Sequence, residues 1–341
     1  MIKFLRYELK KTFPYILLMT SFISIAYMIL LATMRTSWTV DGKIFIGDPH
    51  FWTLHIALIV LSFINPIVVY SFKMTKRGVD GYYALPIKRQ KLFYAKTLVG
   101  LFLTLVPFTV AYFGGVIVLL CRVRNPYYMQ WYAVGYLGFV LLGICLFGVN
   151  AFAFTRANRI GDGILLMIAY ALIGSLTVAY IERAAHTVAY WWLEECFSVW
   201  GSIGAYGRLM GDFIMTNTSP NWTWWIFLYP AVVGAICYVA MFLLLRKEKS
   251  ESAEQISDGW LSYKLAIPIY TALGIGALPF SWLGLALITL AAIAATMLYR
   301  RKLLFSWKYW VMIGIGVVIG VLLMLLVGIL EPPLVNPPDF A

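Results

Sequence analysis

Residue types that do chemistry are sparse in this chain, and none of them stands in a catalytic spacing. Gly42-Lys43 is followed by isoleucine, so the phosphate-binding pattern G-x-x-x-x-G-K-[ST] is missing. Neither H-E-x-x-H nor G-x-S-x-G occurs. The three histidines, His50, His55 and His186, form no metal-ligand spacing. We therefore expect no catalytic residue, no cofactor site and no metal site in this chain.

The composition points to lipid as the main solvent of the chain. Of its 341 residues, 62% are hydrophobic and 12% are charged, whereas soluble proteins average about 25% charged residues. The mean hydropathy is +0.83. These values exclude a soluble globular enzyme, a disordered tail and a coiled coil. Two of the four cysteines, Cys145 and Cys237, lie in apolar runs and are predicted to be buried thiols.

Seven stretches are long and apolar enough to cross a bilayer. A crossing takes roughly 20 residues, because about 30 Å of hydrocarbon is spanned at about 1.5 Å per residue. The predicted spans are 13–34, 51–72, 97–120, 132–155, 161–181, 224–245 and 309–330. In the last of them, Gly316 and Gly320 form a G-x-x-x-G pattern that would let another helix approach closely. None of the seven has an acid or a base at its middle, which counts against an ion-coupled carrier.

Residues 265–299 carry no charge, and we expect them to form two short spans. A single helix of this length would extend about 52 Å, which is too long for one crossing. Pro279-Phe280-Ser281 supplies turn-forming residues near the middle. The sequence therefore predicts an all-α, polytopic membrane protein with about nine transmembrane helices.

The distribution of positive charge predicts the orientation. With the N-terminus in the cytoplasm and nine spans, 21 of the 27 lysines and arginines fall in cytoplasmic segments. This bias is the positive-inside pattern. If 265–299 were one span, Arg300-Arg301-Lys302 would fall outside, so the charges favour two spans and an external C-terminus.

The segments outside the spans complete the predicted organisation. Residues 1–12 alternate apolar and basic positions at helical spacing, which predicts an amphipathic helix on the inner leaflet. We expect a cytoplasmic interfacial helix at 1–12, a six-span core at 13–245 with an external loop at 182–223, a cytoplasmic loop at 246–264, three further spans at 265–330 and an external tail at 331–341.

Two cytoplasmic segments resemble a known family. The run Leu85-Pro86-Ile87-Lys88-Arg89-Gln90-Lys91-Leu92-Phe93-Tyr94-Ala95-Lys96 is similar to the L-P-[IV]-x-R-x-K-[IL]-x-x-x-K segment of ABC-2 type transporter permeases of Gram-positive bacteria. Lys249-Ser250-Glu251-Ser252-Ala253 resembles their [RK]-S-E-x-A-G segment, with Glu254 in place of the glycine. The opening Phe4–Lys11 is similar to their N-terminal amphipathic helix. The matches cover about the first 255 residues, and the C-terminal spans exceed the six-span core of the family.

The resemblance implies that substrate transport and ATP hydrolysis are carried out by different chains. In the family a separate ATPase subunit holds ATP and magnesium, and two permease chains work with two ATPases. Carried over, Leu85, Pro86, Ile87, Lys88 and Arg89 would contact the ATPase, and Lys249 and Glu251 would lie in the second cytoplasmic loop. From composition alone, the basic run at 73–96 is better explained as an orientation signal than as a docking loop. After Pro86, the positions of Ile87 and Leu92 predict a short amphipathic helix that presents both side chains.

The function expected from the sequence is a permease subunit of an ATP-driven exporter in the bacterial cytoplasmic membrane. It would move a peptide, a lipid or a drug-like substrate, and nothing in the sequence selects among these classes. The expected partners are an ATPase subunit, a second permease chain and membrane lipid, with no nucleic acid. One alternative is a subunit for antimicrobial-peptide resistance or sensing without net transport. Another is a membrane-embedded lipid-modifying enzyme, which would need a polar cluster near one interface.

Overall fold

The computed structural model describes residues 2–33, 37–40, 43–46, 51–122, 129–185, 201–203, 206–207, 210, 225–245, 253–255, 259, 261–277, 281–301 and 306–330. The chain divides into two compact units, each described here by itself. Unit 1 comprises Met1–Met167 and Val199–Gln255, and unit 2 comprises Ile168–Ser198 and Ile256–Ala341.

The chain is an all-α polytopic protein, as the sequence predicts. The α-helices are α1 (Ile2–Thr33), α2 (Phe51–Tyr70), α3 (Lys76–Tyr83), α4 (Arg89–Arg122), α5 (Met129–Thr155), α6 (Ile160–Ala185), α9 (Trp225–Leu245), α10 (Tyr263–Ala277), α11 (Trp282–Arg300) and α12 (Trp307–Leu330). A 3₁₀ helix, η1 (Ser71–Met74), precedes α3. Among the described residues, eight helices are long and apolar enough to cross a membrane, and all seven long predicted spans coincide with one of them.

The split of residues 265–299 into two helices is confirmed. Helix α10 ends at Ala277 and α11 begins at Trp282, where the Ser281 hydroxyl caps the new helix by accepting from the Gly284 amide at 3.3 Å. Helix α10 has 15 residues, about 22 Å of rise, which is less than a full crossing. The count of nine spans therefore stays a prediction.

The N-terminal segment is helical as predicted, but it does not form a separate element. Helix α1 runs without interruption from Ile2 to Thr33 and passes through Pro14. The amphipathic part and the first span are thus one continuous helix. Phe4 and Glu8 in the first part and Ile16 in the second are buried inside unit 1.

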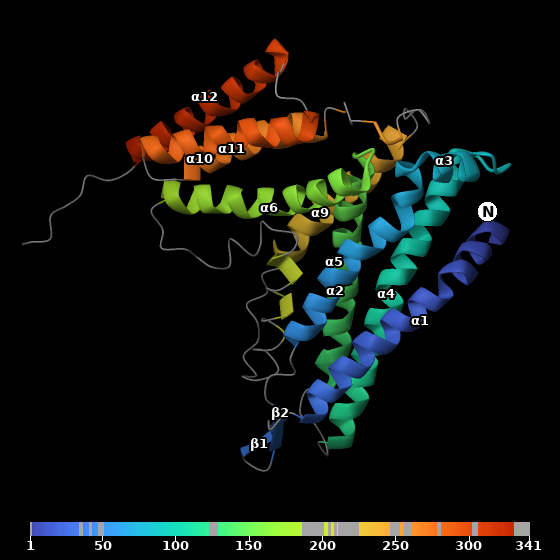
Figure 1. Ribbon diagram of the computed structural model, residues 1–341. Helices are drawn as coiled ribbons and strands as arrows, with labels where there is room; N and C mark the ends of the chain where they lie inside the picture. The colour runs from blue at the N-terminus through green and yellow to red at the C-terminus, as the bar shows by residue number, and fades with distance from the viewer. Residues whose placement is uncertain are drawn as a thin grey trace, which may run out of the picture. The chain divides into compact units, whose positions relative to one another are not determined.

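Unit 1 is a bundle in which neighbouring helices pack lengthwise (Figure 1). Helix α1 lies along α4, α2 contacts both α4 and α5, and α5 packs against α9. Helix α3 lies at the end of the bundle where α1 begins, and the strands β1 and β2 lie at the opposite end. Cys145 on α5 and Cys237 on α9 are buried, which confirms their prediction as core thiols.

A short hairpin that the sequence-based expectations did not include follows α1. Strands β1 (Ser37–Val40) and β2 (Lys43–Ile46) pair antiparallel, with Val40 opposite Lys43. The signal was present in the sequence, because Asp-Gly between two β-favouring runs is typical of a two-residue hairpin turn.

Unit 2 is built on close packing between α10 and α12. A Cβ added at Gly320 would lie 2.8 Å from the Ile275 Cβ and 3.1 Å from the Ala272 Cα, and one added at Gly316 would lie 3.0 Å from the Pro268 carbonyl oxygen. The two glycines therefore let the backbones of α10 and α12 approach each other. The close approach predicted from the G-x-x-x-G pattern is made within the chain itself.

Part of the predicted external loop belongs to the bundle of unit 1. Tyr206 is buried, and its hydroxyl donates to the Val134 carbonyl on α5 at 3.1 Å. Helix α6 continues to Ala185, beyond the predicted loop start at residue 182. Most of 182–223, all of 246–252 and the tail 331–341 lie outside the described residues.

Candidate functional site

In the segment Leu85–Arg89, the position matched by the family motif, residues 85–88 form a short non-helical turn between α3 and α4, and Arg89 is the first residue of α4. Proline lacks an amide hydrogen and disfavours helical backbone at the residue before it, so Pro86 separates the two helices. The turn is closed by backbone bonds: the Leu85 amide donates to the Tyr82 carbonyl at 3.4 Å, and the Ile87 amide donates to the Leu85 carbonyl at 2.7 Å. The structure thus places a compact turn at one end of unit 1.

This turn exposes most of its side chains. Leu85, Pro86, Lys88 and Arg89 are exposed, and Ile87 is half-buried. The Arg89 guanidinium lies 4.4 Å from the centre of the Tyr83 ring at the end of α3, in a cation–π contact. The segment therefore presents a small exposed apolar patch, formed by Leu85 and Pro86, next to the cations Lys88 and Arg89.

The prediction of a short helix after Pro86 that presents Ile87 and Leu92 is wrong in two respects: where the helix begins and ends, and the exposure of Leu92. Helicity begins at Arg89 and continues into the 34-residue helix α4. Leu92 is 1% exposed and packs inside unit 1, so it presents nothing to a partner. A periodic pattern at a helix start is compatible with either burial or exposure, and here the packing of α4 within unit 1 buries Leu92.

A buried ion pair joins α4 to α1 about two helical turns after Arg89. The Lys96 ammonium on α4 is 2.7 Å from Oε2 of Glu8 on α1, and their side chains are 6% and 2% exposed. Breaking such a pair leaves one charge buried without its partner, which costs far more than losing an exposed pair. The sequence pattern alone did not single out either residue: Glu8 lay in the predicted interfacial helix 1–12, and Lys96 was one of the cytoplasmic charges. Glu8 is the only acid in residues 1–40 and follows Phe4 by one helical turn, which was the available signal.

Tyr82 joins this ion pair to the end of α3. Its hydroxyl accepts from Lys96 at 3.0 Å and from Lys11 at 3.2 Å. Its ring packs against Phe72 of η1, with the ring centres 4.6 Å apart. Because Tyr82 lies three positions before Leu85, the entry to the turn is fixed to both α1 and α4.

Glu254 ties three further segments of unit 1 together. Its amide donates to the Asn158 carbonyl at 3.0 Å, its carbonyl accepts from Nε of Arg159 at 2.8 Å, and its Oε1 accepts from the Lys76 amide at 3.1 Å. Glu254 therefore connects the chain after α9 to the turn between α5 and α6 and to the first residue of α3. Lys249 and Glu251, the other predicted residues of this loop, lie outside the described residues.

The backbone of Glu254 has a conformation that favours glycine. Its φ is 65°, in the left-handed region that L side chains adopt at a cost of about 1–2 kcal/mol. This is the position at which the family segment has glycine. The three hydrogen bonds offset the cost of the side chain.

A buried polar chain crosses the middle of unit 1. Tyr15 on α1 donates to Oδ1 of Asn65 on α2 at 2.9 Å, and Nδ2 of Asn65 donates to Thr104 on α4 at 2.9 Å. Helix α2 continues to Tyr70 through Pro66. These polar groups satisfy one another and stabilise the contacts of three helices. They provide no acid–base pair for chemistry.

Within the part of the chain that the structure describes, no three His, Cys, Asp or Glu side chains lie close enough together to hold a metal ion. No protein-family model, no curated protein and no solved structure matches this chain.

Proposed function

We propose that this chain is the permease subunit of an ATP-binding-cassette exporter and that it works with a separate ATPase subunit. The observation that supports the proposal best is the Leu85–Arg89 turn, whose apolar patch and cations are exposed. The end of α3 that leads into this turn is held in place because Tyr82 binds Lys96, which pairs with Glu8. A surface that transmits force to membrane helices needs both properties.

The proposal assigns each part of the unit a role. A peptide, lipid or drug-like substrate would cross the cytoplasmic membrane between two permease chains. ATP and magnesium would bind to the ATPase subunit. The N-terminus and the Leu85–Arg89 turn would face the cytoplasm, where the ATPase is.

The test is co-purification followed by a charge substitution in the turn. Tagged protein is purified in mild detergent from membranes of its native host, and its partners are identified by mass spectrometry. The proposal expects an ATP-binding-cassette ATPase in equal amount and ATP hydrolysis by the complex. Leu85→Asp should release the ATPase, because it places a charge in the apolar patch that the partner would cover.

The competing explanation is that the basic residues only orient the chain in the membrane. It expects Leu85→Asp to keep the ATPase and expects neutralisation of Lys88, Arg89 and Lys91 to disturb insertion. Membrane insertion is therefore checked for both variants. A complex without any ATPase, or full ATPase binding and activity in a normally inserted Leu85→Asp variant, contradicts the proposal.

A further inference from the structure

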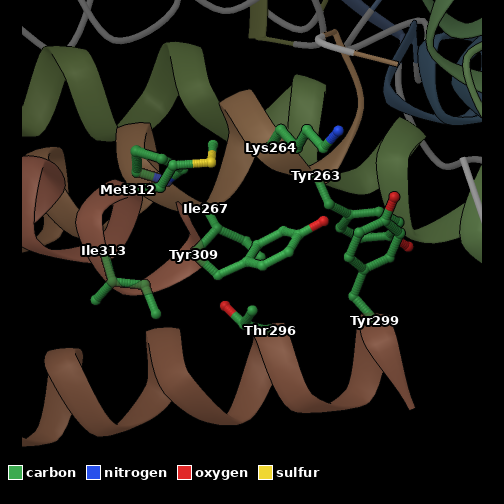
Figure 2. Close-up of a pocket in the computed structure, with 9 residues that line it drawn as sticks. Tyr263, Lys264, Ile267, Thr296, Tyr299, Tyr309, Met312 and Ile313 are labelled. Carbon is green, nitrogen blue, oxygen red and sulfur yellow. The ribbon is translucent and has the colours of Figure 1, made fainter. Parts of the chain in front are cut away.

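A hollow between three helices of unit 2 is largely filled by aromatic side chains. Figure 2 shows it between α10, α11 and α12, where Tyr263, Tyr299 and Tyr309 are among the residues that line it. The centres of the Tyr263 and Tyr299 rings are 4.2 Å apart. The remaining room is mostly apolar and holds about one water molecule, so the three helices pack here and leave no space for a ligand.

Helix α3 in unit 1 is too short to hold its own position. It has eight residues, Lys76–Tyr83, and two of them, Gly78 and Gly81, are poor helix formers. Isolated helices shorter than about 12–15 residues are marginal in water. The position of α3, and of the Leu85–Arg89 turn that follows it, therefore depends on contacts with the rest of unit 1.

The C-terminal end of α3 is held by α1 and α4. The Tyr82 hydroxyl accepts from the ammonium of Lys96 at 3.0 Å and from that of Lys11 at 3.2 Å. Lys96 also pairs with the buried Glu8. The Tyr82 ring packs against Phe72 of η1. These contacts hold the last turn of α3 against the bundle.

The first turn of α3 is held by two side chains. The amides at the start of a helix have no partner inside it. Here the Gly78 amide donates to Oγ1 of Thr75 at 3.3 Å, and the Lys76 amide donates to Oε1 of Glu254 at 3.1 Å. Thr75 is the local cap, whereas Glu254 lies 178 positions away from Lys76 in the chain. A carboxylate is also favoured at this end of a helix, because the helix dipole is positive there.

The backbone of Glu254 is fixed independently of its side chain. Its amide donates to the Asn158 carbonyl at 3.0 Å, and its carbonyl accepts from Nε of Arg159 at 2.8 Å. Both partners lie in the turn between α5 and α6. The carboxylate therefore reaches α3 from an anchored position, and replacing the side chain removes the bond to Lys76 without removing the two backbone bonds.

We propose that Glu254 is a positioning residue of this chain: its carboxylate holds the start of α3, and α3 in turn holds the Leu85–Arg89 turn in place. It is not a catalytic residue, because it acts through α3. The assignment of the turn to an ATPase rests on the proposed function, whereas the hold on α3 is a property of unit 1 alone.

The test is hydrogen exchange of the purified full chain in detergent, followed by mass spectrometry of the peptides that cover α3. Glu254→Gly and Glu254→Ala both remove the acceptor of the Lys76 amide, and each should speed exchange at Lys76–Tyr83 about fivefold, the effect of losing one hydrogen bond. Glu254→Gln keeps an oxygen acceptor and should keep the slow exchange. Gln255→Ala shortens the exposed neighbouring side chain and is the matched control.

Two variants separate the positioning of α3 from a general effect on stability. Glu254→Gly relieves the left-handed backbone and should be more stable overall than Glu254→Ala. If Glu254 positions α3 through its carboxylate, both variants exchange equally fast at α3. Exchange at α3 that matches the wild type in Glu254→Gly, or exchange that is as fast in Glu254→Gln as in Glu254→Ala, would overturn the inference.

Binding of the co-purified ATPase tests the consequence for the turn. A less firmly held α3 leaves a smaller share of the chains ready to bind, so Glu254→Gly should bind the ATPase more weakly than the wild type, by up to about fivefold. A wild-type chain that binds no ATPase would contradict the exporter proposal, and the exchange result would still decide the role of Glu254. An ATPase that binds the wild type and Glu254→Gly equally tightly would overturn the link between Glu254 and the turn.

Discussion

The ammonium of Lys96 lies 2.7 Å from the carboxylate of Glu8, although the two residues are 88 positions apart and both are buried. This pair fixes the start of α4 to the first turns of α1. Because Tyr82 near the end of α3 accepts a hydrogen bond from the same ammonium, the pair also fixes the end of α3 to α1 and α4.

Removing either charge of this pair should destabilise the protein strongly. Lys96→Met leaves the Glu8 carboxylate buried without its cation, and the expected loss is about 3–5 kcal/mol of unfolding free energy. Thermal unfolding in detergent measures it. Lys91→Gln, an exposed lysine on the same helix, is the control and should change little. The double variant Glu8→Gln with Lys96→Met should regain part of the loss; a Lys96→Met protein as stable as the control contradicts the structural role.

Substitutions of Glu254 separate two contributions to stability: the hydrogen bond from the Lys76 amide and the cost of a left-handed backbone. Glu254→Ala removes the acceptor of the Lys76 amide and keeps a Cβ in the left-handed conformation. Glu254→Gly removes the same acceptor but relieves the backbone, so it should be more stable than Glu254→Ala by about 1 kcal/mol. Unfolding temperatures of the two variants, compared side by side, check this order. The reverse order would show that the φ of 65° does not hold in the folded protein.

The contact between α10 and α12 should not tolerate a side chain at Gly320. Gly320→Leu would force the added atoms against Ile275 and the Ala272 backbone, at an expected cost of about 1–3 kcal/mol. Gly314→Leu is the matched control, because a Cβ at Gly314 meets nothing within 4 Å. Proteolysis and thermal unfolding of both variants in detergent distinguish them. Equal stability of the two would argue against the close approach of the helices.

The purified chain without partners should hydrolyse no ATP. The reason is the missing phosphate-binding loop: Gly42-Lys43 is not followed by serine or threonine. Phosphate release is measured from the isolated chain and from its complex with the co-purified ATPase. Turnover that persists in the isolated chain after every other subunit is removed would disprove this expectation.

The two ends of α12 should lie on opposite sides of the membrane. Lys302→Cys and Pro338→Cys are introduced singly into a chain whose native cysteines are replaced, and intact cells are treated with an impermeant thiol reagent. We expect label at position 338 and none at 302, because the Arg300-Arg301-Lys302 cluster favours the cytoplasm. Label at 302 from outside would refute the proposed orientation and the pairing of α10 with α11 as two crossings.

The sequence by itself determined where the membrane helices are. Hydropathy over about 20 residues is a local property, and every long predicted span coincides with a helix, including the division of 265–299. The turn at 85–88 did not follow from these signals, because the sequence predicted a short helix directly after Pro86, whereas helicity begins at Arg89. The all-α class followed from the same local signals, although a two-stranded hairpin escaped them.

Only the tertiary structure decided which charged residues are buried. A count of cytoplasmic charges does not distinguish among the basic residues of 73–96. In the structure, Lys73 and Lys96 are buried, whereas Lys88 and Arg89 are exposed. The same holds for Leu92, whose periodicity suited a partner surface and which is buried inside unit 1 instead. Local patterns specify the face of a helix but not what covers that face. The pairing of Lys96 with Glu8 depends on α1 lying against α4, a contact between helices that no short stretch of sequence encodes.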